Sequence, residues 1–205
     1  MTIPSRAAYQ VTSDTDPPRY VPGYWYTMMP TTALAAGTTG INSLRLMPWM
    51  VRNRVRVSAL GVRVTTGAAG LMQMGIYRAN ATTLDPMNQP VCTTGDIDIS
   101  VAQNVNGAVL GGPITIGPGL HWVGTNNNIG GLVMQGFPNA GPGLAVLTGA
   151  PTQNGVSGAA TTATLLKFCQ TPSTVPYGTW PDANACVWST LATGAVFIGQ
   201  FQVAS

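Results

Sequence analysis

The sequence predicts an all-β protein, and three features of its composition lead to that class. Only 7% of the 205 residues are Asp, Glu, Lys or Arg, compared with about 25% in ordinary soluble domains. Glu is absent and Lys167 is the single lysine, so the residues that usually cover the wet faces of helices are missing. The 25 glycines and 16 prolines favour many turns and few long helices. Because 45% of the residues are apolar, the chain still has enough material for a packed core.

Residues 1–30 are expected to form an extended arm that precedes a single domain spanning residues 31–205. The prolines at the start of the arm stand at positions 4, 17, 18 and 22. Proline lacks a backbone N–H, so this segment is unsuited to a helix or a central strand. Such an arm becomes ordered when the body of the chain or a neighbour holds it, which favours docking to a partner. The aromatic run of Tyr24, Trp25 and Tyr26 is a candidate partner contact.

The run RVRVSALGVRVT, residues 54–65, has the alternation of a half-buried strand. Val55 and Val57 alternate with arginines, and Val62 and Val64 resume the alternation further on. Gly61 predicts a bulge or bend between these two stretches.

Two further runs each show one apolar face. In LMQMGIYR, residues 71–78, the side chains of Met72, Met74 and Ile76 are expected to point inward together. In DIDIS, residues 96–100, the alternation of Asp and Ile is the clearest period-two pattern in the chain.

The remaining segments predict more strands and the loops between them. Residues 109–116 and 120–123 are expected to pair as a hairpin across Gly117-Pro118-Gly119. A turn is expected at residues 104–107 and another at residues 126–128. Further strands are expected at residues 24–29, 41–47, 132–137, 162–169, 186–191 and 195–203. Loops near residues 80–90, 125–130, 138–161 and 170–185 are expected to face outward. Many short strands at this spacing predict an all-β, jelly-roll-like antiparallel β-sandwich with an extended N-terminal arm.

Residues 46–124 carry a series of motifs in a consistent order. They are MPWMVRNRVRVSALGVRVTTGAAG (47–70), LMQMGIYRAN (71–80), DIDIS (96–100) and ITIGPGLHWVG (114–124). In this order and spacing they resemble a β-sandwich module of bacteriophage tail-fibre and other virion surface proteins. The resemblance implies a place on the virion, frequent contact with the host surface, and a homotrimer as the favoured oligomer. It brings no catalytic residues, and His121 departs from it, because the module more often has Tyr there.

Five arginines form the most prominent local group in a chain with so few charges. They are Arg45, Arg52, Arg54, Arg56 and Arg63. Arg52, Arg54 and Arg56 are expected to share one face of a strand. A cluster of positive charges favours an anionic partner, either an acidic neighbour subunit or an anionic host-surface glycan. A solvated strand face, or an edge protected from aggregation by charge, remains the alternative. The group is too small to indicate nucleic-acid binding.

The residue types give little support to an enzyme. His121 is the only histidine, and no nucleophile motif lies near it in the sequence. Asp96 and Asp98 are expected on one strand face. They are interpreted as part of a solvated surface, as a weak calcium site or, least of all, as a pair of catalytic carboxylates. The cysteines and the histidine lack zinc-site spacing, and the glycine-rich stretches lack the Lys of a phosphate-binding loop. No catalytic, cofactor or metal site is therefore predicted.

Cysteine content and hydropathy point to a protein made in a reducing compartment. The three cysteines, Cys92, Cys169 and Cys186, are too few and too dispersed for a disulfide framework. A bridge between Cys169 and Cys186 remains open, with buried thiols as the alternative. The first ten residues lack the apolar region of a secretion signal, and no run approaches the ~20 apolar residues of a membrane span. Assembly in the host cytoplasm, without membrane insertion, is expected.

Taken together, the sequence predicts a structural component of a bacteriophage virion, of the fibre or spike type. The arm would dock it to other virion proteins, and low surface charge favours a homo-oligomer. Two alternatives stay open: a decoration or cement protein that stabilises the capsid, and a carbohydrate-binding or glycan-active protein.

Overall fold

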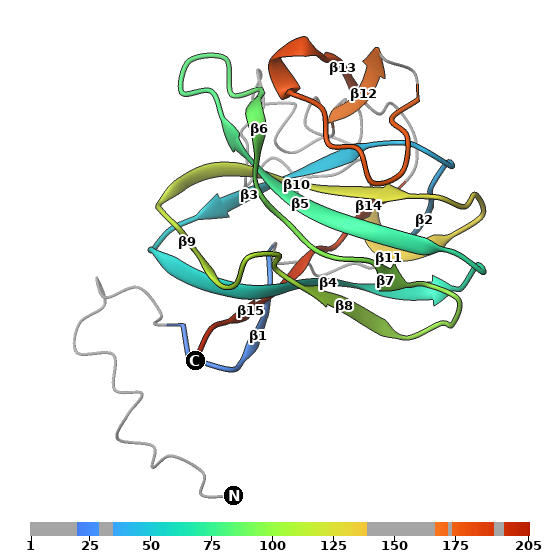
Figure 1. Ribbon diagram of the computed structural model, residues 1–205, viewed down its shortest axis with the longest axis horizontal. Coiled ribbons are helices and arrows are strands. Elements are labelled where there is room, and N and C mark those ends of the chain that lie inside the picture. Colours follow the sequence, from blue (N-terminus) through green and yellow to red (C-terminus); the bar gives the residue numbers. More distant parts are fainter. Residues whose placement is uncertain (1–19, 29–34, 139–166, 172–173, 191–194) are drawn as a thin grey trace, which may run out of the picture.

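The structure, a computed structural model, describes residues 20–28, 35–138, 167–171, 174–190 and 195–205. In this part of the chain two antiparallel sheets pack face to face (Figure 1). The first sheet contains β1 (Trp25–Thr27), β2 (Ala35–Thr38), β4 (Val55–Thr66), β8 (Asn104–Ala108), β9 (Ile114–Ile116), β11 (Val133–Pro138), β14 (Ala195–Phe197) and β15 (Gln200–Val203). The second contains β3 (Arg45–Val51), β5 (Leu71–Ala79), β6 (Pro86–Thr93), β7 (Ile97–Asp98), β10 (Gly119–Asn127), β12 (Lys167–Thr171) and β13 (Val187–Thr190). A 3-10 turn, η2 (Ala183–Ala185), lies between β12 and β13.

The strand order is that of a jelly roll. In the first sheet β2, β11, β4 and β8 are neighbours in that order, and in the second β3, β10, β5 and β6 are. The chain passes between the sheets after β2, β3, β4, β7, β9 and β10, and again between β11 and β12 and between β13 and β14. This interleaving of two Greek keys defines the double-sheet jelly roll. The predicted all-β, jelly-roll-like sandwich is confirmed.

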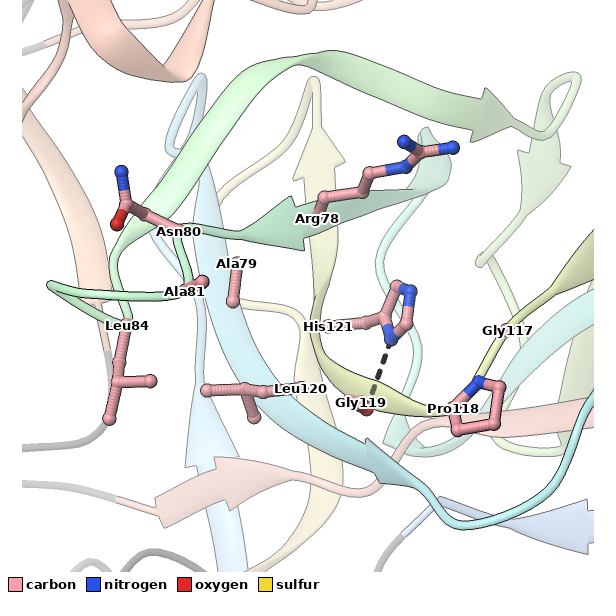
Figure 2. A pocket seen from close by; sticks show the side chains of 10 residues that line it. All are labelled: Arg78, Ala79, Asn80, Ala81, Leu84, Gly117, Pro118, Gly119, Leu120 and His121. Carbon is pink, nitrogen blue, oxygen red and sulfur yellow. Dashed lines mark hydrogen bonds between the residues drawn. The ribbon is translucent and has the colours of Figure 1, made fainter.

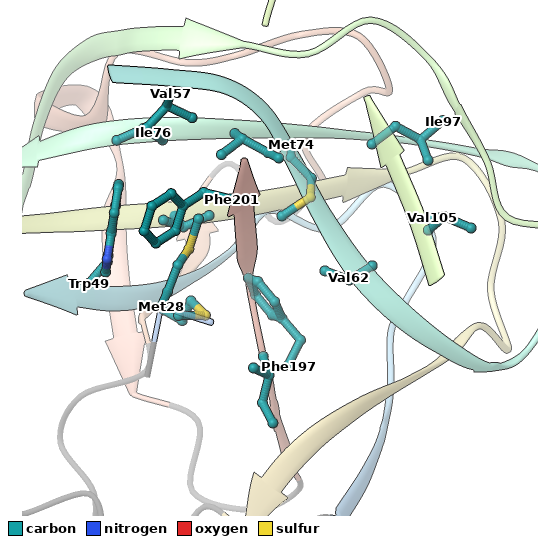
Figure 3. Packing of buried hydrophobic residues seen from close by; sticks show 14 of the residues in the cluster. Met28, Trp49, Val57, Val62, Met74, Ile76, Ile97, Val105, Phe197 and Phe201 are labelled. Atoms are coloured by element: carbon teal, nitrogen blue, oxygen red, sulfur yellow. The ribbon is translucent and has the colours of Figure 1, made fainter. Parts of the chain in front are cut away.

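The core between the sheets follows the predicted alternation in β5. Met72, Met74 and Ile76 are fully buried and pack in one cluster with side chains from β3, β4 and β15 (Figure 3). Trp49 and Phe201 meet across the two sheets, with ring centroids 4.9 Å apart.

β4 changes its inward-facing phase, but the bulge is not at Gly61. Val57 pairs with Val203 and Ala59 with Gln202, so Ser58 is the extra residue on this strand. After it the buried positions move from the odd-numbered valines to Leu60 and those that follow. Gly61 has a different role, because a Cβ there would lie 2.7 Å from the carbonyl oxygen of Val105.

The predicted hairpin across Gly117-Pro118-Gly119 is wrong. β9 pairs with β4 in the first sheet, whereas β10 pairs with β3 and β5 in the second. The Gly-Pro-Gly segment therefore carries the chain across the end of the sandwich. A turn sequence of this kind reverses the chain whether or not the strands on either side pair with each other.

Several predicted turns are strands in the structure. Residues 104–107 belong to β8, where Val105 is buried in the core. Asn126 and Asn127, expected in an outward loop, end β10 and are fully buried. Residues 86–90, also expected in a loop, begin β6. The expected strand at 195–203 is broken into β14 and β15 at Ile198-Gly199. The loop at residues 138–161 lies almost entirely outside the described residues.

The outer face of the second sheet is covered rather than exposed. Residues 174–186 lie over it, and a second apolar cluster forms between the two. Its fully or nearly buried members are Leu44, Leu46, Tyr77, Trp122, Val175 and Ala183. The loop expected to face outward at residues 170–185 is thus, where the structure describes it, a cover that packs against the sheet. We call residues 174–186 the cover segment.

Two glycines make room for the cover segment. Gly75 and Gly124 are paired across β5 and β10. A Cβ on Gly75 would lie 2.8 Å from the ring of Trp180, and one on Gly124 would lie 3.2 Å from it. No side chain therefore separates these strands from the indole, and the close approach explains why residue 75, within the run LMQMGIYRAN, is a glycine.

The described part of the predicted arm, residues 20–28, lies along the first sheet. β1 pairs with β15, and the N–H of Gly23 donates to the carbonyl oxygen of Val203 at 2.8 Å. Residues 1–19 and the expected arm boundary near residue 30 lie outside the described residues.

Substituting Gly75→Ala should destabilise the fold by about 1–3 kcal/mol, because the added methyl group must displace the Trp180 ring. Gly130→Ala is a matched control, since a Cβ there would meet only the backbone nitrogen of Ile41, at 3.9 Å. Chemical denaturation measures both free energies of unfolding. Equal stabilities of the two variants would show that Trp180 does not require the glycine.

Candidate functional site

A pocket of about 470 Å³ opens at one end of the sandwich, where β5 and β10 stop pairing. Their last paired residues are Arg78 and His121. Beyond them Ala79 pairs with β6 and Leu120 pairs with β3, so the two strands diverge. We call the pocket between them the notch. Its walls are residues 78–81, Leu84 and residues 117–121.

One wall of the notch is polar. The side chains of Arg78 and His121 lie on the same side of the paired strands (Figure 2). Arg78 is exposed, and among the described residues no carboxylate forms an ion pair with it. His121 is 8% exposed, and its ring packs near Trp49, with centroids 6.2 Å apart.

The tautomer of His121 follows from its hydrogen bond. Nδ1 lies 3.2 Å from the carbonyl oxygen of Gly119, which can only accept, so Nδ1 carries the proton and donates (Figure 2). Burial has the largest effect on the pKa of His121 and lowers it. The hydrogen bond to Gly119 raises this pKa by a smaller amount, and the charge of Arg78 lowers it again. The imidazole is therefore neutral at pH 7, and Nε2 is a hydrogen-bond acceptor.

The other wall is apolar and includes a strained residue. Leu84 has φ of 61°, a left-handed conformation that is costly for a leucine. The loop holds it there: the carbonyl oxygen of Leu84 accepts from Trp122 Nε1 at 2.9 Å, and its N–H donates to the carbonyl oxygen of Asn80 at 2.9 Å. Asn80 Oδ1 in turn accepts from the N–H groups of Thr82 and Thr83. The side chain of Leu84 is left 52% exposed at the edge of the notch.

The structure divides the five predicted arginines. Arg52 and Arg54 are exposed in the turn between β3 and β4, and Arg56 is exposed on β4 near them. The expected single strand face is therefore wrong, because the strand ends at Val51 and the chain turns through residues 52–54. Val51 pairs with Gly119, which places this turn at the same end of the sandwich as the notch.

Arg45 and Arg63 lie elsewhere. Arg45 starts β3 opposite Thr125, and burial lowers its pKa. Arg63 lies toward the far end of β4, opposite Asn104. Four arginines thus gather at one end of the sandwich: Arg52, Arg54, Arg56 and Arg78. We call it the basic end. Asp85, from the loop that follows β5, also lies there.

The predicted aromatic contacts differ in exposure. Tyr24 is 54% and Trp25 is 39% exposed, whereas Tyr26 is half-buried. The ring of Tyr26 stacks on Phe201 with centroids 5.7 Å apart, and its hydroxyl accepts from the N–H of Val21. Tyr24 and Trp25 therefore remain candidate partner contacts, and Tyr26 holds the described end of the arm on the sheet.

Asp96 and Asp98 do different things and do not act as a pair. Asp96 accepts from the hydroxyl of Tyr177 at 2.6 Å and from Gln73 Nε2 at 2.9 Å. Gln73 Oε1 accepts from Trp180 Nε1 at 3.1 Å, so this network ties the cover segment to β5. The Tyr177 and Gln73 hydrogen bonds lower the pKa of Asp96. Asp98 accepts from the N–H of Ser100, which lowers its pKa.

Within the described residues no group of three or more His, Cys, Asp or Glu side chains is placed to hold a metal ion. No described helix is long and apolar enough to cross a membrane. Cys92 is a buried thiol whose pKa is raised to about 12 by burial. The side chain of Cys169 lies outside the description, so its bridge to Cys186 stays a prediction.

Comparison with known proteins adds no assignment. No family model matches the chain, and no curated protein sequence matches it. The resemblance of residues 46–124 to the tail-fibre module stays a prediction.

Sequence reasoning missed the notch and the role of the cover segment. The sequence places Arg78 at the end of a predicted strand and Leu84 in a predicted polar loop. No local pattern shows where β5 and β10 diverge, so the pocket between them was not predicted. The run Asn80-Ala81-Thr82-Thr83 was the available signal, since an Asn followed by Thr residues favours a side-chain-capped turn.

Acid should weaken the hydrogen bonds that join Asp96 to the cover segment. Because the pKa of Asp96 is lowered in the folded state, its stabilising effect is full above the ordinary pKa of Asp, about 4. It is lost as the pH falls through the lower folded value. The Trp180 indole N–H resonance should therefore shift below about pH 4. Asp96→Asn, which keeps the hydrogen-bond acceptor but does not titrate, should remove this shift.

Asp98→Asn is the control, because Asp98 also has a lowered pKa but bonds to Ser100 and not to the cover segment. A Trp180 shift that persists in Asp96→Asn would contradict the assignment.

Proposed function

We propose that the protein is a non-enzymatic structural subunit of a bacteriophage virion, of the fibre or spike type. In this proposal the N-terminal arm docks it to other virion proteins, and the basic end meets an anionic host surface. It acts as a homo-oligomer, with a trimer as the favoured form.

The observation that carries the proposal is the gathering of exposed arginines at one end of a jelly roll that has few charges. Charged residues make up 7% of the chain, and Arg52, Arg54 and Arg56 are exposed together at one end. Asp96 and Asp98 lie at the opposite end, beside the start of β5. A local group of one sign attracts a partner of the other sign over a distance of about 8 Å in physiological salt.

The fold contributes an analogy only. Double-sheet jelly rolls occur in viral capsid and lectin domains and in cupins, and a fold by itself does not assign a function. A metal-dependent cupin-type site finds no support in the described residues, which include no candidate metal-ligand group. Virion and lectin roles both fit an exposed end that carries a basic group and a pocket.

The proposal is tested with particles that carry Arg52→Gln together with Arg54→Gln. Both side chains are exposed in a turn, so folding should be unaffected. The rate of adsorption to host cells should fall about tenfold at low salt, with unchanged incorporation into the particle. The difference should shrink as ionic strength rises, because salt screens the attraction.

Arg63→Gln is the matched control, because Arg63 lies away from the basic end. Unchanged adsorption of the double variant would overturn the host-contact role. Normal adsorption per particle, combined with lower incorporation or lower heat stability of the particles, would instead identify a cement protein.

A further inference from the structure

The notch has the size and shape of a small-molecule site. Its volume of about 470 Å³ falls within the range of ligand pockets, roughly 300–1,000 Å³. It is built on the ends of two strands whose pairing is continuous from Met72/Asn127 to Arg78/His121. Strands hold their backbone in place more firmly than loops do, so the pairing fixes the positions from which Arg78 and His121 project. The imidazole is held further by its hydrogen bond to Gly119.

The polar wall of the notch offers several hydrogen-bond donors beside one hydrogen-bond acceptor. The guanidinium of Arg78 presents a planar set of N–H groups that matches a carboxylate, and within the described part of the chain no carboxylate occupies it. Nε2 of His121 accepts a hydrogen bond, because Nδ1 donates to Gly119. Arg78 and His121 are cross-strand neighbours on one side of the sheet. A ligand that fits them carries a carboxylate and, next to it, a hydroxyl group.

The apolar wall offers a surface for carbon-bound hydrogens. Leu84 and Leu120 line the notch on the side away from Arg78 and His121 (Figure 2). The strained φ of Leu84 is maintained by hydrogen bonds to its backbone, while its side chain stays largely exposed. Strain of this kind tends to occur at functional sites. The exposed side chain gains little from burial in the fold and is accessible to a ligand.

We propose that the notch binds a hexuronic acid, the hydroxylated carboxylic acid unit of acidic saccharides. Arg78 holds the carboxylate, His121 accepts from an adjacent hydroxyl, and Leu84 and Leu120 lie against the C–H face of the ring. Among the residues that line the notch, Arg78 is the one cationic side chain. It suits a ligand with one negative charge rather than a phosphate with two. The choice of a saccharide over a free acid rests on the proposed contact with the host surface.

The experiment is titration calorimetry on the isolated full chain with galacturonate, its oligosaccharides and neutral galactose. Galacturonate should bind more tightly than galactose, and Arg78→Gln should weaken it about tenfold, as expected for a hydrogen bond to a charged group. Arg63→Gln, at the other end of β4, should not change it. Equal affinity for galactose, or no effect of Arg78→Gln, would overturn the site.

Leu84→Asn separates a ligand contact from a structural role. Asn adopts a positive φ at lower cost than Leu, so the melting temperature should stay the same or rise. Affinity for galacturonate should nevertheless fall a few-fold. A clear loss of stability would show instead that the Leu84 side chain is needed for packing, and would remove the apolar wall from the proposal.

The source of the ligand is decided by the oligosaccharides. Binding of oligogalacturonides at least as tight as that of the monomer supports a glycan chain, and binding of the monomer alone overturns the saccharide source. Because the titration uses isolated protein, its failure is distinct from a failure of the adsorption experiment. A positive titration with unaffected adsorption would leave the site in place and reject its role in host contact.

Discussion

The pair of glycines at the centre of the second sheet constrains much of the rest of the molecule. Gly75 and Gly124 leave no side chain between the strands and the indole of Trp180. The cover segment can therefore lie directly on the sheet, where Tyr77 donates to the carbonyl oxygen of Pro181 at 3.0 Å. With one face against the core and the other under the cover, this sheet becomes the middle layer of the fold. That explains why seven consecutive residues of β10, from position 121 to 127, are buried.

A sheet held on both faces is a firm base for a site at the ends of its strands. β5 and β10 pair along their length and then separate toward β6 and β3, which creates the notch without a special insertion. The same end of the sandwich carries the exposed arginines of the 52–56 segment. In the proposed function these two features act in sequence. The arginines attract an anionic surface from a distance, and the notch then selects one chemical unit of it.

The sequence predicted what depends on local alternation and failed where a second layer intervenes. Met72, Met74 and Ile76 were assigned correctly, because a strand with one buried face repeats every two residues. Asn126 and Asn127 were assigned to a turn, since nothing local shows that the cover segment buries Asn126 or that Asn127 donates to the carbonyl oxygen of Gly40. The Gly117-Pro118-Gly119 turn was recognised but its strands were paired wrongly, because a crossover between sheets uses the same turn chemistry as a hairpin. The arginine group was predicted from the sequence, but only Arg52, Arg54 and Arg56 lie together in the structure. Arg78 lies at the same end because β5 pairs with β10, and the periodicity of the sequence does not encode that pairing.

Electron cryo-microscopy of the intact particle tests the central claim most directly, because it locates the jelly roll and the direction in which its basic end points. The account predicts the sandwich on the particle surface, with Arg52, Arg54 and the notch facing solvent. If the basic end is instead buried at a junction between capsid subunits, or the chain is missing from the particle, the account is contradicted.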